Sequence, residues 1–460
     1  MKIKAGLCGA LLLLATATAY GLGAQIGQAQ SPAPASSTPA IPDAAMAQLG
    51  ARARAYVTGL GVDPDSENGR ILVQWLIKIA QVPEYRANLS ALDASPNPLG
   101  GVTFSPENRL KMLRLMKEVA SESRDDCKLK QPGRDDFGGL AKTLSPKGFR
   151  SALETIEIIL TQRSGLAGVE EHYTVAELLD ADARFNSVAL PESRSKGHES
   201  DNCALFAFLI DAMVALPEPQ RQRATYEFFK RIGGGKQASE SVLGDPAAYL
   251  DDVFDERRLP DPIRRRLPPD GSRPLPFSRL IVDAEWVNKK VPEASFPVTD
   301  TYVNRRNNGV VAELITSQDK SGKTTWSDFT LSFGIADMFF QSVGSDTTML
   351  RTLKDDTAIA IANQSMVKGK RIEMPIPQPS RKGEMSRRCE VGMTVPASTI
   401  FRTLTGDAVD LDCSEIGKDG TTTRVRATWL SDYGIALSRA FDGAEGRTDV
   451  VIKNVTIVKP

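Results

Sequence analysis

Histidine is nearly absent from this sequence of 460 residues, in which His172 and His198 are the only two. A zinc site or a histidine-dependent hydrolase needs histidines at fixed spacing from carboxylates or thiolates, and no His-Glu-x-x-His or paired-cysteine motif occurs. No Gly-x-Ser-x-Gly motif occurs either, which removes the nucleophile elbow of the α/β-hydrolases. The sequence therefore predicts no metal and no cofactor, and it names no catalytic residue.

Net charge is also absent, because 57 Lys and Arg residues balance 57 Asp and Glu residues. Proteins that bind nucleic acid through its phosphates usually carry a basic excess on the binding domain. We therefore predict that this chain has no nucleic-acid partner.

Long apolar segments are missing beyond the first two dozen residues. Those residues contain Lys2 and Lys4, then four consecutive leucines at 11–14, then a stretch of small residues. This order is typical of a secretory signal peptide, which we place at residues 1–29 with cleavage between about residue 19 and residue 30. An uncleaved anchor is the alternative, although the apolar part is shorter than the roughly 20 residues that span a bilayer. We expect a periplasmic protein with no transmembrane span after signal removal.

Cysteine is scarce, and its number is informative. Five cysteines occur, and removal of Cys8 with the signal peptide leaves an even number. In an oxidising compartment this favours two disulfides, with four buried free thiols as the alternative. The two halves of the chain have different residue patterns, so we predict that pairing occurs within each half. The predicted pairs are Cys127 with Cys203 and Cys389 with Cys413.

Proline, alanine and serine fill residues 30–42, which predicts a flexible spacer. From residue 43 to residue 256 the apolar spacing is helical, and we predict an all-α domain there. Ser66 is placed to cap one helix, and Pro146 suits the first turn of another. Residues 203–216 are apolar almost all round, so we predict that they form the central helix of this domain.

Residues 257–277 combine many prolines with a cluster of arginines. This much proline is incompatible with a continuous helix or sheet, so we predict a solvated linker between two domains. Contact of its arginines with anionic lipid is the alternative.

The apolar period changes to two over residues 278–460, which predicts β-strands. Phe329, Leu331 and Phe333 alternate with polar residues, and the positions 389, 391, 393 and 395 do the same. Glycine-containing turns at 307–309, 320–322 and 418–420 suit hairpins. We expect an α+β protein in which the helical domain precedes a mainly antiparallel sandwich or partly open barrel.

Three motifs imitate functional sites without meeting their requirements. Residues 321–324, Ser-Gly-Lys-Thr, resemble the end of a phosphate-binding loop but lie between strand-like segments. Ser193 and Lys196, with the Ser-Asp-Asn of residues 200–202, imitate elements of penicillin-binding enzymes but lie in one polar stretch. Asp63 and Asp65 hint at a calcium loop whose glycine is misplaced.

The leading hypothesis is thus an exported, non-enzymatic protein that binds a protein or an envelope component. An envelope hydrolase or serine acyl-transferase is one alternative, because scattered carboxylates are not recognisable in a single sequence. A carrier of an apolar ligand in the β-domain is the other.

Overall fold

A computed structural model describes residues 43–82, 85, 104–122, 136–163, 172–195, 202–345, 347–353, 357–362, 364–377, 385–417, 422–443 and 446–460. The predicted signal peptide and spacer, and Cys127, lie outside the described residues. The chain divides into two compact units. The helical unit comprises Met1–Thr174 and Val188–Gln237, and the β unit comprises Val175–Ser187 and Ala238–Pro460.

Amphipathic helices build the helical unit, and their starts follow the predicted capping chemistry. The Oγ atom of Ser66 accepts a hydrogen bond from the Gly69 N–H at 3.0 Å, and Pro146 is the first residue of its helix. The helices are α3 (Asp43–Gly59), α4 (Glu67–Gln81), α6 (Pro106–Glu122), α7 (Asp136–Thr143), α8 (Pro146–Arg163), α10 (Asn202–Val214) and α11 (Gln220–Ile232). Helix α9 (Val175–Ser195) is shared, because its first part, Val175–Ser187, belongs to the β unit.

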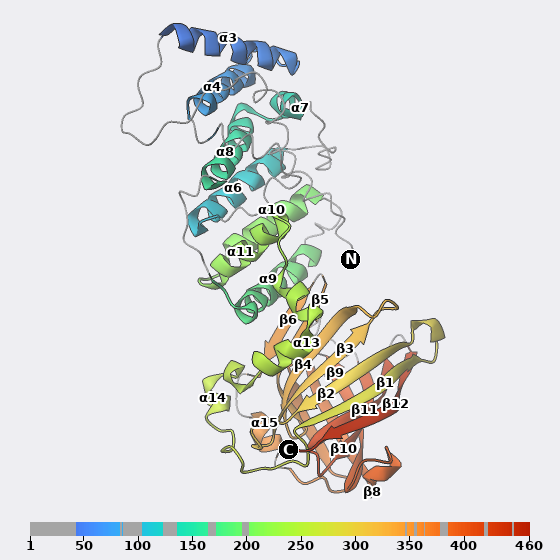
Figure 1. Cartoon of the computed structure of the whole chain (residues 1–460). Helices are drawn as coiled ribbons and strands as arrows, with labels where there is room; N and C mark the ends of the chain where they lie inside the picture. Colours follow the sequence, from blue (N-terminus) through green and yellow to red (C-terminus); the bar gives the residue numbers. More distant parts are fainter. Residues whose placement is uncertain are drawn as a thin grey trace. The chain divides into compact units, whose positions relative to one another are not determined.

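Helix α6, and not the apolar α10, is the best-surrounded helix of this unit. It packs against α8, α10 and α11, and Met112 and Leu113 are fully buried in these contacts. Figure 1 shows α4, α8, α6 and α10 following one another in a row. The prediction of a central helix at residues 203–216 is therefore wrong, and residues 203–209 are only half-buried. Uniform apolarity indicates that a helix avoids water, but it does not say how many neighbours surround it.

One twelve-stranded antiparallel sheet forms the core of the β unit. Its strands follow the order β6-β5-β4-β3-β2-β1-β12-β11-β10-β9-β8-β7, so β1 pairs with β12 and the edges are β6 and β7. The strands are β1 (Arg279–Asn288), β2 (Phe296–Val303), β3 (Val310–Gln318), β4 (Thr324–Phe333), β5 (Ala336–Gly344), β6 (Thr348–Thr352), β7 (Arg371–Ile376), β8 (Met385–Pro396), β9 (Asp407–Gly417), β10 (Thr422–Leu430), β11 (Ile435–Gly443) and β12 (Gly446–Val458).

The sheet curls on itself (Figure 1). Strand β5 contacts β7, although the two edges are not joined by a ladder of hydrogen bonds in the described residues. The expectation of an antiparallel, partly open barrel is confirmed. A single sheet can bury its inner face in this way because the twist of each strand accumulates around the curl.

Short helices cover the outer face of β3, β4 and β5. They are α12 (Ala238–Gly244) and α13 (Pro246–Asp252), and Tyr249 of α13 packs edge-on against Phe329 with ring centroids 5.0 Å apart. The structure therefore places residues 238–256 with the strands, earlier than the boundary predicted at 257–277. The predicted linker itself contains η2 (Glu256–Arg258) and α14 (Asp261–Arg264). Arg258 is 10% exposed and pairs with Asp180 of α9, which no solvated linker would do.

Backbone details explain one failure of the alternating pattern. Met393 was expected to face the core, but a register shift between Val391 and Thr394 turns it outward, and it is 53% exposed. A bulge adds one residue to a strand and so reverses the faces that follow it. The predicted turns at Gly309 and Gly322 are present with φ of +88° and +81°, whereas residues 418–420 lie outside the described part of the chain.

Candidate functional site: a carboxyl-lined lumen

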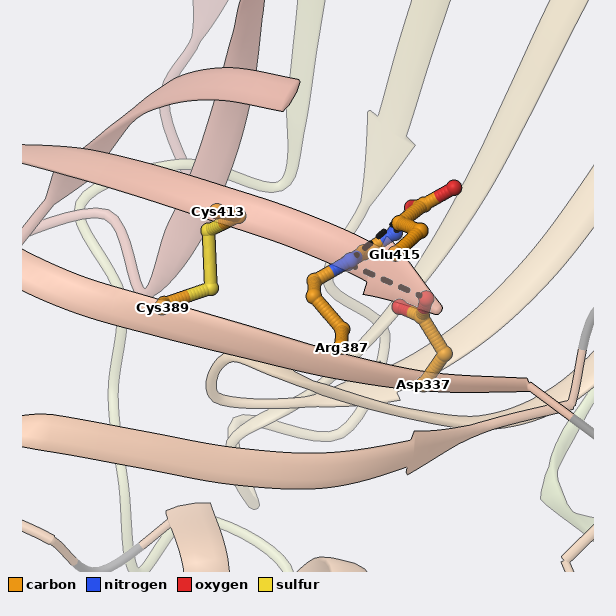
Figure 2. The surroundings of a disulfide bond; sticks show 5 residues. All are labelled: Asp337, Arg387, Cys389, Cys413 and Glu415. Carbon is orange, nitrogen blue, oxygen red and sulfur yellow. Dashed lines mark hydrogen bonds and ion pairs between the residues drawn. A yellow bond between two sulfur atoms is a disulfide. The ribbon is translucent and has the colours of Figure 1, made fainter. Parts of the chain in front are cut away.

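The disulfide between Cys389 and Cys413 is present as predicted, and it joins β8 to β9 (Figure 2). The two cysteines are direct partners in the β8–β9 register, and both line the interior of the curled sheet. The pairing of Cys127 with Cys203 stays a prediction, because Cys127 lies outside the described residues.

The interior of the curled sheet, here called the lumen, contains a cavity of about 290 Å³. An apolar cluster that includes Phe277, Leu280, Val311, Tyr433 and Ile435 adjoins it, and Ile435 belongs to both. The rest of the lining contains polar side chains and aromatic ones such as Trp286. The carboxyl groups that line the cavity belong to Asp300, Glu313, Asp328, Asp337 and Glu415.

Arg387 of β8 holds two of these carboxyl groups in ion pairs. Its guanidinium lies 2.7 Å from Glu415 on β9 and 3.7 Å from Asp337 on β5. Figure 2 shows the Arg387 side chain between the two acids, two residues from the disulfide along β8. Burial raises the pKa of Asp337, and the positive charge of Arg387 opposes this rise. The three side chains form an ion-paired cluster that links β5, near one edge of the sheet, to β8 and β9, near the other edge.

The other three carboxyl groups have no such cation. Burial raises the pKa of Asp300 to about 7 and that of Asp328 to about 7. Burial also raises the pKa of Glu313 to about 8, and the nearby charges of Asp300 and Asp337 add to this effect. A carboxylate removed from water without a counter-ion takes up a proton instead. This half of the lumen therefore holds acids that are close to neutral at physiological pH.

Two oxygen atoms of this group lack hydrogen-bond partners. Among the described residues nothing bonds to Oδ1 of Asp300 or to Oδ1 of Asp328, although both atoms are buried. Asp300 is only 8% exposed. Most buried polar atoms in folded proteins have a partner, and leaving one without costs about 1 to 3 kcal/mol. These two atoms are therefore the strongest indication of a ligand in the lumen.

Aromatic side chains form the wall next to the acids. The ring of Trp286 lies 5.1 Å from Phe441 and 6.3 Å from Trp326, measured between centroids, and all three line the cavity. A hydrogen bond also joins Trp326 to the carboxyl group of Asp328. The lumen thus combines carboxyl groups with an aromatic surface, as sites for small polar or cationic molecules often do.

Sequence reasoning missed these acids, although the pattern contained a signal. Asp300 stands in phase with Val298 and Tyr302, and Glu313 stands in phase with Val311 and Ile315. An acidic residue at the inward phase of a strand is unusual, since that position is normally apolar. The signal is weak, because acidic residues on separate strands come together only when the sheet curls.

Within the part of the chain that the structure describes, the sequence motifs that resemble functional sites do not line the lumen. Ser321 and Gly322 form the exposed turn between β3 and β4, in which Asp319 accepts hydrogen bonds from the backbone N–H groups of Ser321 and Lys323. No helix follows this turn, so it lacks the geometry of a phosphate-binding loop. Ser193 lies in α9, whereas Lys196, residues 200 and 201, and His198 are outside the described residues.

The calcium-like acids serve a turn before α4. Oδ1 of Asp63 accepts a hydrogen bond from the Asp65 N–H at 2.9 Å, and Asp65 pairs with Arg54 at 2.7 Å. Within the described ranges, no group of three or more His, Cys, Asp or Glu side chains is arranged to hold a metal ion.

A second hollow of about 1110 Å³ lies mainly against the opposite face of β8, β9 and β10. Two of its arginines pair across strands, Arg388 with Glu373 at 3.0 Å and Arg371 with Glu390 at 3.7 Å. It is wide and open, and these exposed pairs are satisfied by one another. The lumen is therefore the better candidate site.

None of the helices in the described part of the chain is long and apolar enough to cross a membrane. No protein-family model matches the chain, and no curated protein sequence matches it. Among solved structures, the crystal structure of a beta-barrel-like protein of the domain of unknown function DUF1849 from Brucella abortus is similar at 12% identity. The match covers 41% of this chain and 99% of that chain with a TM-score of 0.26.

Proposed function

We propose that this chain is an exported, non-enzymatic binding protein whose β unit encloses one small ligand in its lumen. The observation that carries the proposal is Asp300, which lines a cavity of about 290 Å³ and whose buried Oδ1 atom has no partner among the described residues. A ligand that hydrogen-bonds to this atom would remove the cost of leaving it unsatisfied.

The size and lining of the cavity support a small molecule over a macromolecule. Its volume is at the lower end of the range of about 300 to 1,000 Å³ for small-molecule sites. Carboxyl groups and aromatic rings both line it, so a ligand would be held with its polar group at the acids. The lining differs from the apolar cavity that a carrier of a purely apolar ligand requires, because five carboxyl groups face it.

Export to the periplasm is part of the proposal. It is supported by the leader-like sequence of residues 1–29 and by the Cys389–Cys413 disulfide, which fits an oxidising compartment. The partner that we propose is a small molecule of that compartment.

Hydrolysis is not proposed, because the carboxyl groups are poorly matched to it. Acid–base hydrolysis by two carboxyl groups needs one protonated and one ionised group at the same pH. Burial raises the pKa of Asp300, Glu313 and Asp328 together, to between about 7 and about 8. The two further carboxyl groups of the lumen, Asp337 and Glu415, are engaged by Arg387 and so are not free to serve as the base.

The binding proposal is tested with three probes of nearly the same shape and different charge: 3,3-dimethylbutylamine, 3,3-dimethylbutan-1-ol and 3,3-dimethylbutanoate. Binding to the mature chain is followed by ligand-observed NMR and by titration calorimetry. We expect at least one probe to bind with a stoichiometry of about one per chain, since a lumen of this size holds one small ligand.

Matched variants locate the binding. Ser438→Phe places a large ring in the lumen, which Ser438 lines, and is expected to abolish binding. Ser414→Phe adds the same ring on β9, one residue past the lumen-lining Cys413, and is expected to leave binding unchanged. Circular dichroism confirms that both variants fold. Failure of all three probes to bind, or binding that survives Ser438→Phe, would overturn the proposal.

A further inference from the structure

The charges that line the lumen do not balance. Five carboxyl groups face the cavity, and Arg387 is the one basic side chain among the described residues that line it. Its guanidinium is already engaged with Glu415 and Asp337. The remaining acids, Asp300, Glu313 and Asp328, face the cavity without a cation of their own. A positively charged ligand would stabilise the ionised forms of these acids, whereas an anion would oppose their ionisation.

The two acids that carry the unsatisfied oxygen atoms lie on the lumen face of the sheet, two strands apart. In the sheet register Asp300 of β2 lies opposite Ile315 of β3, which lies opposite Asp328 of β4. The two acids therefore flank Ile315 on the same face, with backbones about 10 Å apart for two strand spacings. An ammonium group has three N–H donors and no acceptor, so it can bond to an unsatisfied carboxylate oxygen without leaving an acceptor of its own unpaired.

The surface beside these acids suits the rest of such a ligand. Trp326 lies two residues before Asp328 on β4, and Trp286 packs against it with centroids 6.3 Å apart. Indole rings attract cations to their faces and cover aliphatic groups well. The cavity volume of about 290 Å³ limits the ligand to a small molecule.

We propose that the lumen binds a small primary alkylammonium ion, with its ammonium group on Asp300 and its alkyl group against Trp286 and Trp326. This identification of the ligand class rests on the proposed function of the β unit. On this proposal the acids of the lumen, and not only its volume, determine which ligands bind.

Binding of a cation is then coupled to release of protons. The groups that titrate or carry charge around the site are Asp300 and Tyr302 on β2, Glu313 on β3, Asp328 on β4, Asp337 on β5, Arg387 on β8 and Glu415 on β9. Burial raises the pKa of Asp300 and of Asp328 to about 7, so both are largely protonated below that pH. A cation favours the ionised forms, and its affinity rises as the pH rises through about 7.

The test compares the amine probe with its alcohol and carboxylate analogues by calorimetry at about pH 6 and about pH 8. The amine stays protonated over this range, as a lysine side chain with a pKa of about 10.4 does. We expect it to bind at least about tenfold more tightly than either analogue at pH 8, and about tenfold more tightly at pH 8 than at pH 6. The alcohol is expected to show no rise with pH.

Asp300→Asn keeps the shape of the side chain and removes its charge, so it should weaken amine binding at pH 8 by about tenfold or more. Asp283→Asn is the matched control, because Asp283 is on the outward face of the adjacent β1 and contacts Thr299 and Asn454. It should leave the amine affinity unchanged. Equal or tighter binding of the alcohol or the carboxylate, or an amine affinity independent of pH, overturns the ammonium proposal while the lumen remains a binding site. If no probe binds, the proposed function itself fails.

Discussion

At the scale of single residues, the carboxyl groups of the lumen act against the stability of the protein that contains them. Asp300, Glu313 and Asp328 have pKa values of about 7, 8 and 7 in the folded chain, all raised by burial. In an unfolded chain such groups titrate near pH 4. Between about pH 4 and about pH 7 the folded state therefore binds more protons, and its stability falls as the pH rises. Ionisable groups that lower the stability of the folded state in this way are typical of functional sites.

Asp300→Asn should remove part of this pH dependence. The amide resembles the protonated acid, so we expect the free energy of unfolding to increase by about 2 kcal/mol at pH 8 and to change little at pH 4. Urea unfolding followed by tryptophan fluorescence measures the effect, because Trp286, Trp326 and Trp429 all belong to the β unit. Equal destabilisation at both pH values would show that the carboxyl group is needed for packing.

At the scale of elements, the disulfide keeps β8 and β9 in the register that positions Arg387. Cys389 faces Cys413, and two residues further along the ladder Arg387 faces Glu415. A slip of one residue would turn Arg387 out of the lumen, because successive side chains point to opposite faces of a strand. The disulfide and the ion pair therefore depend on the same register.

Replacing both Cys389 and Cys413 by serine should destabilise the β unit by about 3 kcal/mol, from the loss of a crosslink over 24 residues. Urea unfolding of the variant and of the wild type, without reductant, gives the difference. Wild-type protein treated with reductant is the control and should unfold at a similarly lowered urea concentration. An unchanged midpoint would show that the ladder alone fixes the register.

At the scale of the whole molecule, the two units are not consecutive segments of the chain. Val175–Ser187, the first part of α9, belongs to the β unit, although residues 188–237 return to the helical unit. Asp180 in this part pairs with Arg258, whose side chain also contacts Gln341 on β5 at 3.2 Å. The β unit therefore includes part of a helix, α9, that is separated from its other elements by α10 and α11.

Asp180→Asn should lower the stability of the β unit by about 1 kcal/mol, because it leaves the largely buried Arg258 without its carboxylate. Asp65→Asn, which removes an exposed ion pair with Arg54 in the helical unit, is the matched control and should have little effect on this unit. Tryptophan fluorescence during urea unfolding compares the two. Equal effects of both substitutions would argue against a specific role of α9 in the β unit.

The sequence alone determined the class of each region, because local patterns carry that information. Helical spacing with Ser66 as a cap, alternating residues such as Phe329 and Leu331, and positive-φ glycines in turns depend on neighbours a few positions away. The Cys389–Cys413 pair was also predictable, because both residues stand in phase with apolar neighbours on strands close in sequence.

Only the tertiary structure decided which strands close the lumen and which acids meet inside it. Asp300, Glu313, Asp337, Arg387 and Glu415 come from five different strands, and their pKa values depend on the burial that closure creates. The central position of α6, the place of residues 238–256 beside the sheet and the outward turn of Met393 were likewise set by packing and by a bulge. Electrostatic interaction depends on distance in space, and a single sequence records only distance along the chain.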